Sequence, residues 1–122
     1  MSFDVRIFGH DGLVRMPVTN QGGQFSSDSV FQLRQPYLWA QKLTTNGTTP
    51  VASTAAALPA GQTQDKTSVL RIEIPDGQSI RYEVNPPGRN VAASTSSPIM
   101  SGNNQLQFGV GWTISIIDAA GT

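Results

Sequence analysis

Few side chains in this sequence could take part in acid–base or nucleophilic chemistry. The one histidine, His10, stands in the segment Gly9-His10-Asp11-Gly12, whose residue types are typical of a turn. A nucleophile–base pair would need His10 beside a serine with a carboxylate behind the ring, and no local motif supports that arrangement. We therefore expect His10 to lie at the surface in a turn, and the chain not to be an enzyme.

Metal, phosphate and glycosidic sites are also unsupported. The chain has no cysteine and no Asp-x-Asp or His-x-x-x-His spacing, and no glycine loop runs into Lys-Ser or Lys-Thr. The two glutamates, Glu73 and Glu83, fall on positions that we expect to form a solvated strand face beside arginines. No cofactor, metal ion or small-molecule substrate is predicted.

Three aromatic residues could form a carbohydrate-binding site. Tyr37, Trp39 and Trp112 could form a flat platform on which a sugar stacks, as in β-sandwich lectin domains. Trp112 is in phase with the apolar positions of the C-terminal segment, which favours a place in the core. Tyr37 and Trp39, beside Pro36, are left open between core and surface.

The strongest structural signal is the alternation from Gln105 to Ile117, which predicts one β-strand with a single buried face. At about 3.3 Å per residue this strand would be on the order of 40 Å long. Its apolar positions are Leu106, Phe108, Val110, Trp112, Ile114 and Ile116. Gly109 and Gly111, on the other face, would allow a sharp bend or a close approach by another backbone.

Shorter alternations predict further strands at Phe3–Ile7 and Leu13–Val18, and one bulged or two short strands within Val30–Leu43. Asn20–Ser29, with its glycines and serines, is predicted as a loop.

The segment Thr67–Asn85 is predicted as a hairpin that turns at Pro75-Asp76-Gly77. A three-residue loop with a bulge would place the apolar residues of both strands on one face, with Ile72 opposite Ile80 and Leu70 opposite Tyr82. The other face would carry neighbouring charges of opposite sign, Glu73 with Arg81 and Arg71 with Glu83.

Charge is scarce and balanced over the chain. Charged residues make up 13%, with eight basic and eight acidic residues, and the arginines are scattered. Without a concentrated positive field, nucleic acid and anionic membrane are not expected partners. No apolar run approaches the roughly 18 residues of a membrane span, and the N-terminus lacks a secretory-signal layout. We predict a single all-β domain over residues 1–122, a two-sheet antiparallel sandwich whose neutral surface a partner can cover.

Residues 44–67 are rich in Thr and Ala and are predicted as a long loop or arm. Its apolar anchors would be Val51, Leu58 and Pro59. Such a segment can order on a partner and exchange conformational entropy for contact area. Pairing along the edge of Leu13–Val18 is a second route to a neighbouring protein.

The pattern over the whole chain resembles that of the small jelly-roll cement, or decoration, proteins that coat the capsids of tailed bacteriophages. The resemblance rests on the domain size, the few charges, the absence of cysteine, the Thr/Ala/Ser/Gly loops and the final strand Leu-Gln-Phe-Gly-Val-Gly-Trp-Thr-Ile-Ser-Ile-Ile. It implies a jelly-roll-like protein that is assembled in the host cytoplasm and binds the outer capsid surface of the virion. Such a protein would bridge neighbouring major capsid proteins, as a homo-dimer or homo-trimer.

The residues that we expect at the partner interface are apolar, aromatic or cationic: Val51, Leu58, Pro59, Tyr37, Trp39 and Arg89. Two alternatives stay open. One is a carbohydrate-binding or host-recognition β-sandwich module, and the other is a phage tail or baseplate adaptor.

Overall fold

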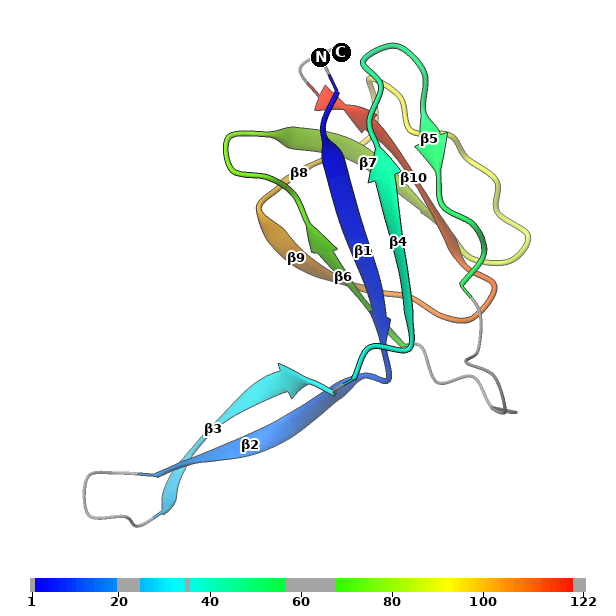
Figure 1. Ribbon diagram of the computed structural model, residues 1–122. Helices are drawn as coiled ribbons and strands as arrows, with labels where there is room; N and C mark the ends of the chain where they lie inside the picture. Colours follow the sequence, from blue (N-terminus) through cyan, green and yellow to red (C-terminus); the bar gives the residue numbers. More distant parts are fainter. Residues whose placement is uncertain (1, 20–24, 35, 57–67, 120–122) are drawn as a thin grey trace.

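The computed structural model describes residues 2–19, 25–34, 36–56 and 68–119, with the backbone alone for residues 15–19 and 25–31. These residues form β-strands and no helix: two four-stranded antiparallel sheets and a separate two-stranded hairpin. Figure 1 shows the hairpin projecting from one end of the body that the two sheets form. The all-β fold with two antiparallel sheets is as predicted.

The first sheet has the strand order β4-β1-β6-β9. Its strands are β1 (Asp4–His10), β4 (Trp39–Thr44), β6 (Val69–Glu73) and β9 (Asn103–Gln107). β1 lies inside the sheet, so that Phe8 has Ala40 as its neighbour on one side and Arg71 on the other. Both edges of β1 are therefore hydrogen-bonded.

The second sheet has the strand order β5-β10-β7-β8. Its strands are β5 (Val51–Ala52), β7 (Ser79–Asn85), β8 (Ile99–Ser101) and β10 (Thr113–Asp118). Ile116 on β10 lies between Val51 and Tyr82 in the register. β5 is a short edge strand, and short edges give a neighbouring chain little to pair with.

Side chains of both sheets meet in one apolar core. Seven of its members have no exposed surface: Val5, Ile7, Leu70 and Ile72 from the first sheet, and Ile80, Ile114 and Ile116 from the second. Burying a side chain of this size contributes about 1.5–3 kcal/mol to folding. Because both sheets supply the same interior, the body is a β-sandwich.

The predicted hairpin at Thr67–Asn85 is wrong, because its two strands belong to different sheets. β6 pairs with β1 and β9, whereas β7 pairs with β10 and β8. Ile72 and Ile80 therefore enter the core from opposite sheets instead of lying side by side. The turn at Pro75-Asp76-Gly77 does exist, with Gly77 at φ +79°, but it carries the chain from one sheet to the other. An alternating pattern shows which face of a strand is buried and not which strand it pairs with.

The ion pairs of Glu73 and Glu83 form within one strand or with a loop, and not between β6 and β7. Arg71 forms an ion pair with Glu73 on its own strand, and Glu83 forms one with Arg89. The expected lattice of charges between β6 and β7 requires them to be neighbours in one sheet, so it does not form.

The prediction of one long strand at Gln105–Ile117 is also wrong. β9 ends at Gln107 in the first sheet and β10 begins at Thr113 in the second. The chain turns between them, where Trp112 N donates to Gly109 O over 3.1 Å and Gly111 has φ +85°, a value that favours glycine. The alternation survives this corner because both strands and the turn face the same core.

β2 (Leu13–Thr19) and β3 (Phe25–Leu33) form the projecting hairpin (Figure 1). We call this hairpin the arm; it is a different segment from residues 44–67, which were predicted as a long loop or arm. Within the described residues the two strands pair with each other and with no strand of the sandwich. The predicted loop at Asn20–Ser29 is too long, since residues 25–29 belong to β3 and residues 20–24 lie outside the described residues. The segment Val30–Leu43 holds the end of one strand and most of the next, as one of its two interpretations predicted.

Residues 44–56, the first half of the predicted loop, lie along the sandwich. β5 pairs with β10, Ser53 N donates to Ile114 O over 2.9 Å, and Ala56 N donates to Trp112 O over 3.0 Å. The Ala56 side chain is part of the core. This stretch therefore closes an edge of the second sheet, while residues 57–67 lie outside the described residues.

Candidate functional site

His10 is buried, so its expected place in a surface turn is wrong. β1 extends through His10 before the chain turns, and the side chain has 0% exposure. Its Nδ1 lies 2.8 Å from the carbonyl oxygen of Arg34, and Arg71 Nε donates to its Nε2 over 3.3 Å. Both ring nitrogens are occupied, and neither partner is a serine, so the ring does not activate a nucleophile.

The described part of the chain contains no cluster of three or more His, Cys, Asp or Glu residues that could hold a metal ion. Glu73 and Glu83 lie on different sheets, and each forms an ion pair with an arginine. Among the residues described, no helix has the length and apolar character of a membrane span.

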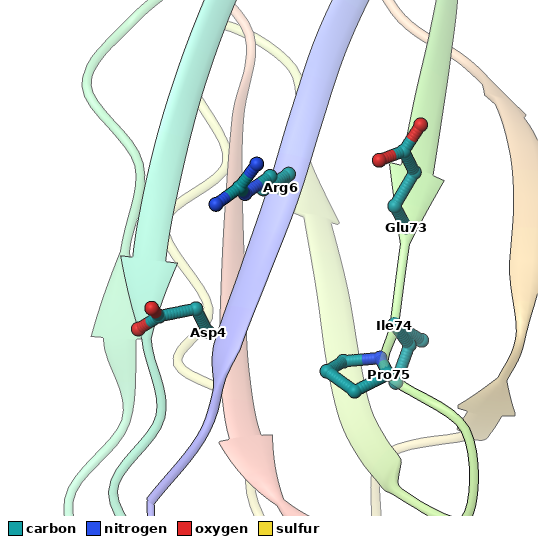
Figure 2. A pocket seen from close by; sticks show the side chains of 5 residues that line it. All are labelled: Asp4, Arg6, Glu73, Ile74 and Pro75. Atoms are coloured by element: carbon teal, nitrogen blue, oxygen red, sulfur yellow. The ribbon is translucent and has the colours of Figure 1, made fainter.

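Charged side chains lie exposed on the outer face of the first sheet. They border an open groove of about 450 Å³, lined by Asp4, Arg6, Glu73, Ile74 and Pro75 (Figure 2). Lys42 pairs with Asp4 over 3.9 Å, and Arg71 pairs with Glu73. In the described part of the chain Arg6 has no ion-pair partner, so one cation on this face is unmatched. An open groove of this kind suits a polar contact with a protein better than an enclosed small ligand.

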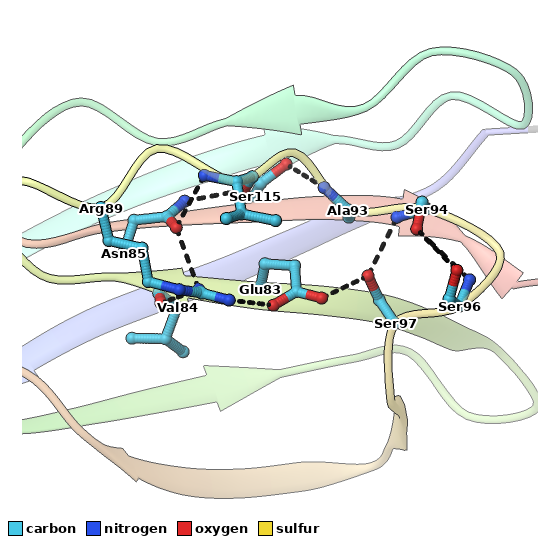
Figure 3. Close-up of polar contacts among 10 residues, drawn as sticks. Glu83, Val84, Asn85, Arg89, Ala93, Ser94, Ser96, Ser97 and Ser115 are labelled. Atoms are coloured by element: carbon cyan, nitrogen blue, oxygen red, sulfur yellow. Dashed lines mark hydrogen bonds and ion pairs between the residues drawn. The ribbon is translucent and has the colours of Figure 1, made fainter.

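The outer face of the second sheet is covered by the chain's own residues 86–98 (Figure 3). The Asn85 side chain binds both backbone groups of Val91: its Nδ2 donates to the carbonyl oxygen over 2.9 Å, and its Oδ1 accepts from the amide over 3.0 Å. Ala93 N donates to Ser115 Oγ over 2.9 Å. Ser115 and Ile117 are buried under this cover, so β10 is buried on both faces.

Glu83 also holds residues 86–98 against the second sheet. Ser97 Oγ donates to Glu83 Oε2 over 2.6 Å, and Arg89 Nη2 donates to Oε1 over 2.9 Å (Figure 3). The hydrogen bond from Ser97, followed by that from Arg89, lowers the pKa of Glu83 from its ordinary value of 4.5 and outweighs partial burial, which acts the other way. Arg89, expected at a partner interface, also donates to Val84 O of β7 over 2.6 Å and so holds its loop against the second sheet.

The expected aromatic platform is not assembled. Tyr37, 49% exposed, packs edge-on against Phe8 of the first sheet's outer face, with the ring centroids 5.1 Å apart. Trp39 instead stacks on Phe108 at 6.1 Å, and Trp112 tilts against the same ring at 5.9 Å. Both tryptophans pack on the core, which confirms the expected place of Trp112 and leaves Tyr37 as the exposed aromatic ring of the three.

The remaining interface residues fall in the segment 44–67. Val51 is half-buried in β5 and packs against the core, so its apolar surface is partly used within the chain. Leu58 and Pro59 lie outside the described residues. Of the expected interface set, Tyr37 is therefore the member that offers most exposed apolar surface in the described part of the chain.

The arm is the element that offers a neighbouring protein most backbone. Among the described residues, each of its strands is hydrogen-bonded along one edge and has no strand along the other, with pairs running from Leu13 with Leu33 to Thr19 with Phe25. An open edge is a template for pairing with another chain. The sequence predicted the first strand as an edge for pairing but placed a loop over residues 25–29 of the second, although Gly22-Gly23 between two β-prone runs is a hairpin signal.

Comparison with protein-family models, with curated proteins and with solved structures found no match. The functional conclusion therefore depends on the chain's own geometry.

Proposed function

We propose that the protein is a non-enzymatic structural component of a virus particle, which binds the outer capsid surface and stabilises neighbouring major capsid proteins as decoration proteins do. The observation that carries the proposal is the arm, which projects from the sandwich and, in the described part of the chain, pairs with itself alone (Figure 1). A two-stranded hairpin is only marginally stable in water. A neighbouring protein that pairs with the arm's edges would supply the missing contacts.

The surface of the body suits the same role. With a net charge of zero and 13% charged residues, a partner can cover this surface while stranding few charges. Residues 86–98 already occupy the outer face of the second sheet, so a partner would contact the first sheet and the arm. Arg6 would then meet a carboxylate of the partner, which favours the correct orientation on binding.

Modest contacts are sufficient if one molecule, or a homo-dimer or homo-trimer, touches several capsid subunits. Each additional contact then forms within the complex, and the overall binding can exceed that of one contact by about 10²–10⁴-fold. A regular shell provides such repeated contacts at its symmetry axes.

The test compares the wild-type chain with a variant in which residues 14–32 are replaced by a short Asn-Gly turn. Co-sedimentation with mature capsids of the virus that encodes the protein measures binding, and near-ultraviolet circular dichroism confirms that the sandwich is intact. We expect stoichiometric binding by the wild type and none by the variant. Wild-type protein that ignores the capsids would refute the function, whereas equal binding by both proteins would refute only the arm's part in it. Binding to tail or baseplate rings in place of shells would favour the adaptor alternative.

A second candidate, carbohydrate or host recognition, has one feature in its favour. An open hollow of about 390 Å³ lies beside Trp112, with Arg89 and Gln107 as its polar residues. Sugar sites combine an aromatic face with a few polar groups. A glycan array would favour this candidate if the wild type bound one class of sugar and Gln107→Ala, at an exposed position, lost that binding.

A further inference from the structure

A buried histidine joins the arm to the sandwich. His10 is the last residue of β1 and Arg34 directly follows β3, so the two stand at the two roots of the arm. His10 Nδ1 is 2.8 Å from the carbonyl oxygen of Arg34. Backbone bonds hold the same region, since Arg34 N donates to Gly12 O over 2.9 Å and Leu38 N donates to Gly9 O over 2.7 Å.

The hydrogen-bond partners fix the protonation state of the ring. A carbonyl oxygen can only accept, so Nδ1 of His10 carries a hydrogen. The Nε–H of Arg71 can only donate, so Nε2 of His10, 3.3 Å away, accepts and carries none. His10 is therefore uncharged in this arrangement, and each nitrogen has the one role open to it.

A second proton on the ring would have no acceptor among the described residues. It would sit on Nε2 and point at the Nε–H of Arg71, placing two positive charges side by side across the 3.3 Å contact. Arg71 has two other interactions. It forms an ion pair with Glu73, and its guanidinium group makes a cation–π contact with Phe8, with the guanidinium carbon 4.2 Å from the centre of the ring. These two contacts oppose a movement of Arg71, so the repulsion acts to push the ring of His10 away from it.

The other titratable and charged groups around the ring do not offset this repulsion. Tyr37, from the connection between β3 and β4, has its ring centroid 6.4 Å from that of His10. Asp11 follows His10 in the chain, and the Arg34 side chain is exposed. Glu73 reaches His10 only through Arg71. Among the described residues no carboxylate hydrogen-bonds to the ring.

We propose that His10 is a pH-sensitive latch on the arm. The uncharged ring holds the carbonyl of Arg34 and fixes the arm against the sandwich. Protonation of the ring, the change of charge that histidine side chains undergo between about pH 5 and 8, expels the ring from its site and frees the arm to change its orientation. The latch is a property of the isolated chain, so it does not depend on the function proposed above.

The experiment measures the arm's orientation directly. The chain has no cysteine, so single cysteines at Ser27 on the arm and at the exposed Ser101 on the sandwich can carry two spin labels without other changes. Pulsed electron resonance then gives the distribution of distances between the labels at about pH 8 and about pH 5, the limits of histidine titration. We expect a narrow distribution at the higher pH and loss of its narrow component at the lower, with the near-ultraviolet circular dichroism unchanged.

Two variants separate a latch from a merely structural histidine. In His10→Gln the amide can donate to Arg34 O and accept from Arg71 but cannot gain a proton, so the distribution should stay the same at both pH values. If that variant does not fold, Arg71→Gln removes the opposing charge and should weaken the pH effect. An unchanged wild-type distribution between the two pH values would overturn the latch. Equal broadening in the wild type and in the folded variant would overturn it as well.

Discussion

The sandwich and the arm are built from strands of similar length that differ in what surrounds them. β1 and β2 both have seven residues. β1 is hydrogen-bonded along both edges and buries Val5 and Ile7 completely, whereas β2 is bonded along one edge in the described part of the chain. The sandwich is therefore stabilised by its own core, whereas a separate two-stranded hairpin such as the arm is only marginally stable by itself.

A substitution in the core should lower the free energy of unfolding most, and it gives the value with which the other variants are compared. Ile116→Ala removes a side chain with 0% exposure, and we expect the free energy of unfolding to fall by about 2–5 kcal/mol. Urea unfolding followed by tryptophan fluorescence measures the change. The matched control is Ile99→Ala, whose side chain is 57% exposed in β8 and whose loss should change the free energy by less than about 0.5 kcal/mol. Equal losses in the two variants would contradict the assignment of the core.

The cover over the second sheet should contribute less. Asn85→Ala removes both hydrogen bonds to the backbone of Val91, and we expect a loss of about 2 kcal/mol in the free energy of unfolding. Asn103→Ala, at an exposed position of β9, is the control and should have little effect. If the two variants were equally stable in urea, residues 86–98 would not be fastened as the structure has them.

The same cover should make the sandwich sensitive to acid. The pKa of Glu83 is lowered in the fold, so its hydrogen bonds stabilise the protein above the ordinary value of 4.5, and this stabilisation is lost as the pH falls below that value and through the lowered one. Urea unfolding of the wild type should show this loss. Glu83→Gln should be less stable near neutral pH and show a smaller decrease on acidification. A decrease of the same size in both proteins would assign the acid sensitivity to other groups.

A substitution in the arm should have the smallest effect on the unfolding of the sandwich. β3 pairs with β2 alone among the described residues, so Val30→Ala should leave the free energy of unfolding within about 0.5 kcal/mol of the wild type. The measurement is the same urea titration used for Ile116→Ala. A loss as large as that of the core variant would mean that the arm and the sandwich unfold as one unit.

The sequence predicted where the strands lie better than which strands are hydrogen-bonded to each other. The alternations around Ile7, Ile72, Ile80 and Ile114 correctly identified buried faces, because a period of two reports one-sided burial directly. It does not report hydrogen-bonded neighbours, so β6 and β7 were paired wrongly. Nor does it register a corner at which the chain changes sheets, as between β9 and β10. The glycines near that corner were noticed, but the pattern continued through them.

The candidate site was less predictable, because it depends on residues distant in the sequence. His10 is buried by contacts with Arg34, Tyr37 and Arg71, none of which a turn-like local segment can reveal. The contact of Arg89 with Glu83 was not predicted, since nothing in its neighbourhood in the sequence shows that the chain returns to Glu83. The arm combines a predicted strand with one that was predicted in part as a loop. That its strands pair with no strand of the sandwich, in the part of the chain that the structure describes, is a tertiary property.

Amide hydrogen exchange of the free protein tests the contrast between the sandwich and the arm most directly. Exchange rates report the free energy of opening at each hydrogen bond. We predict slow exchange, limited by global unfolding, for β1, β6 and β10, and fast exchange through local opening for β2 and β3. Protection of the arm equal to that of β1 in the free protein would contradict the account, because the arm would then be stable without a partner.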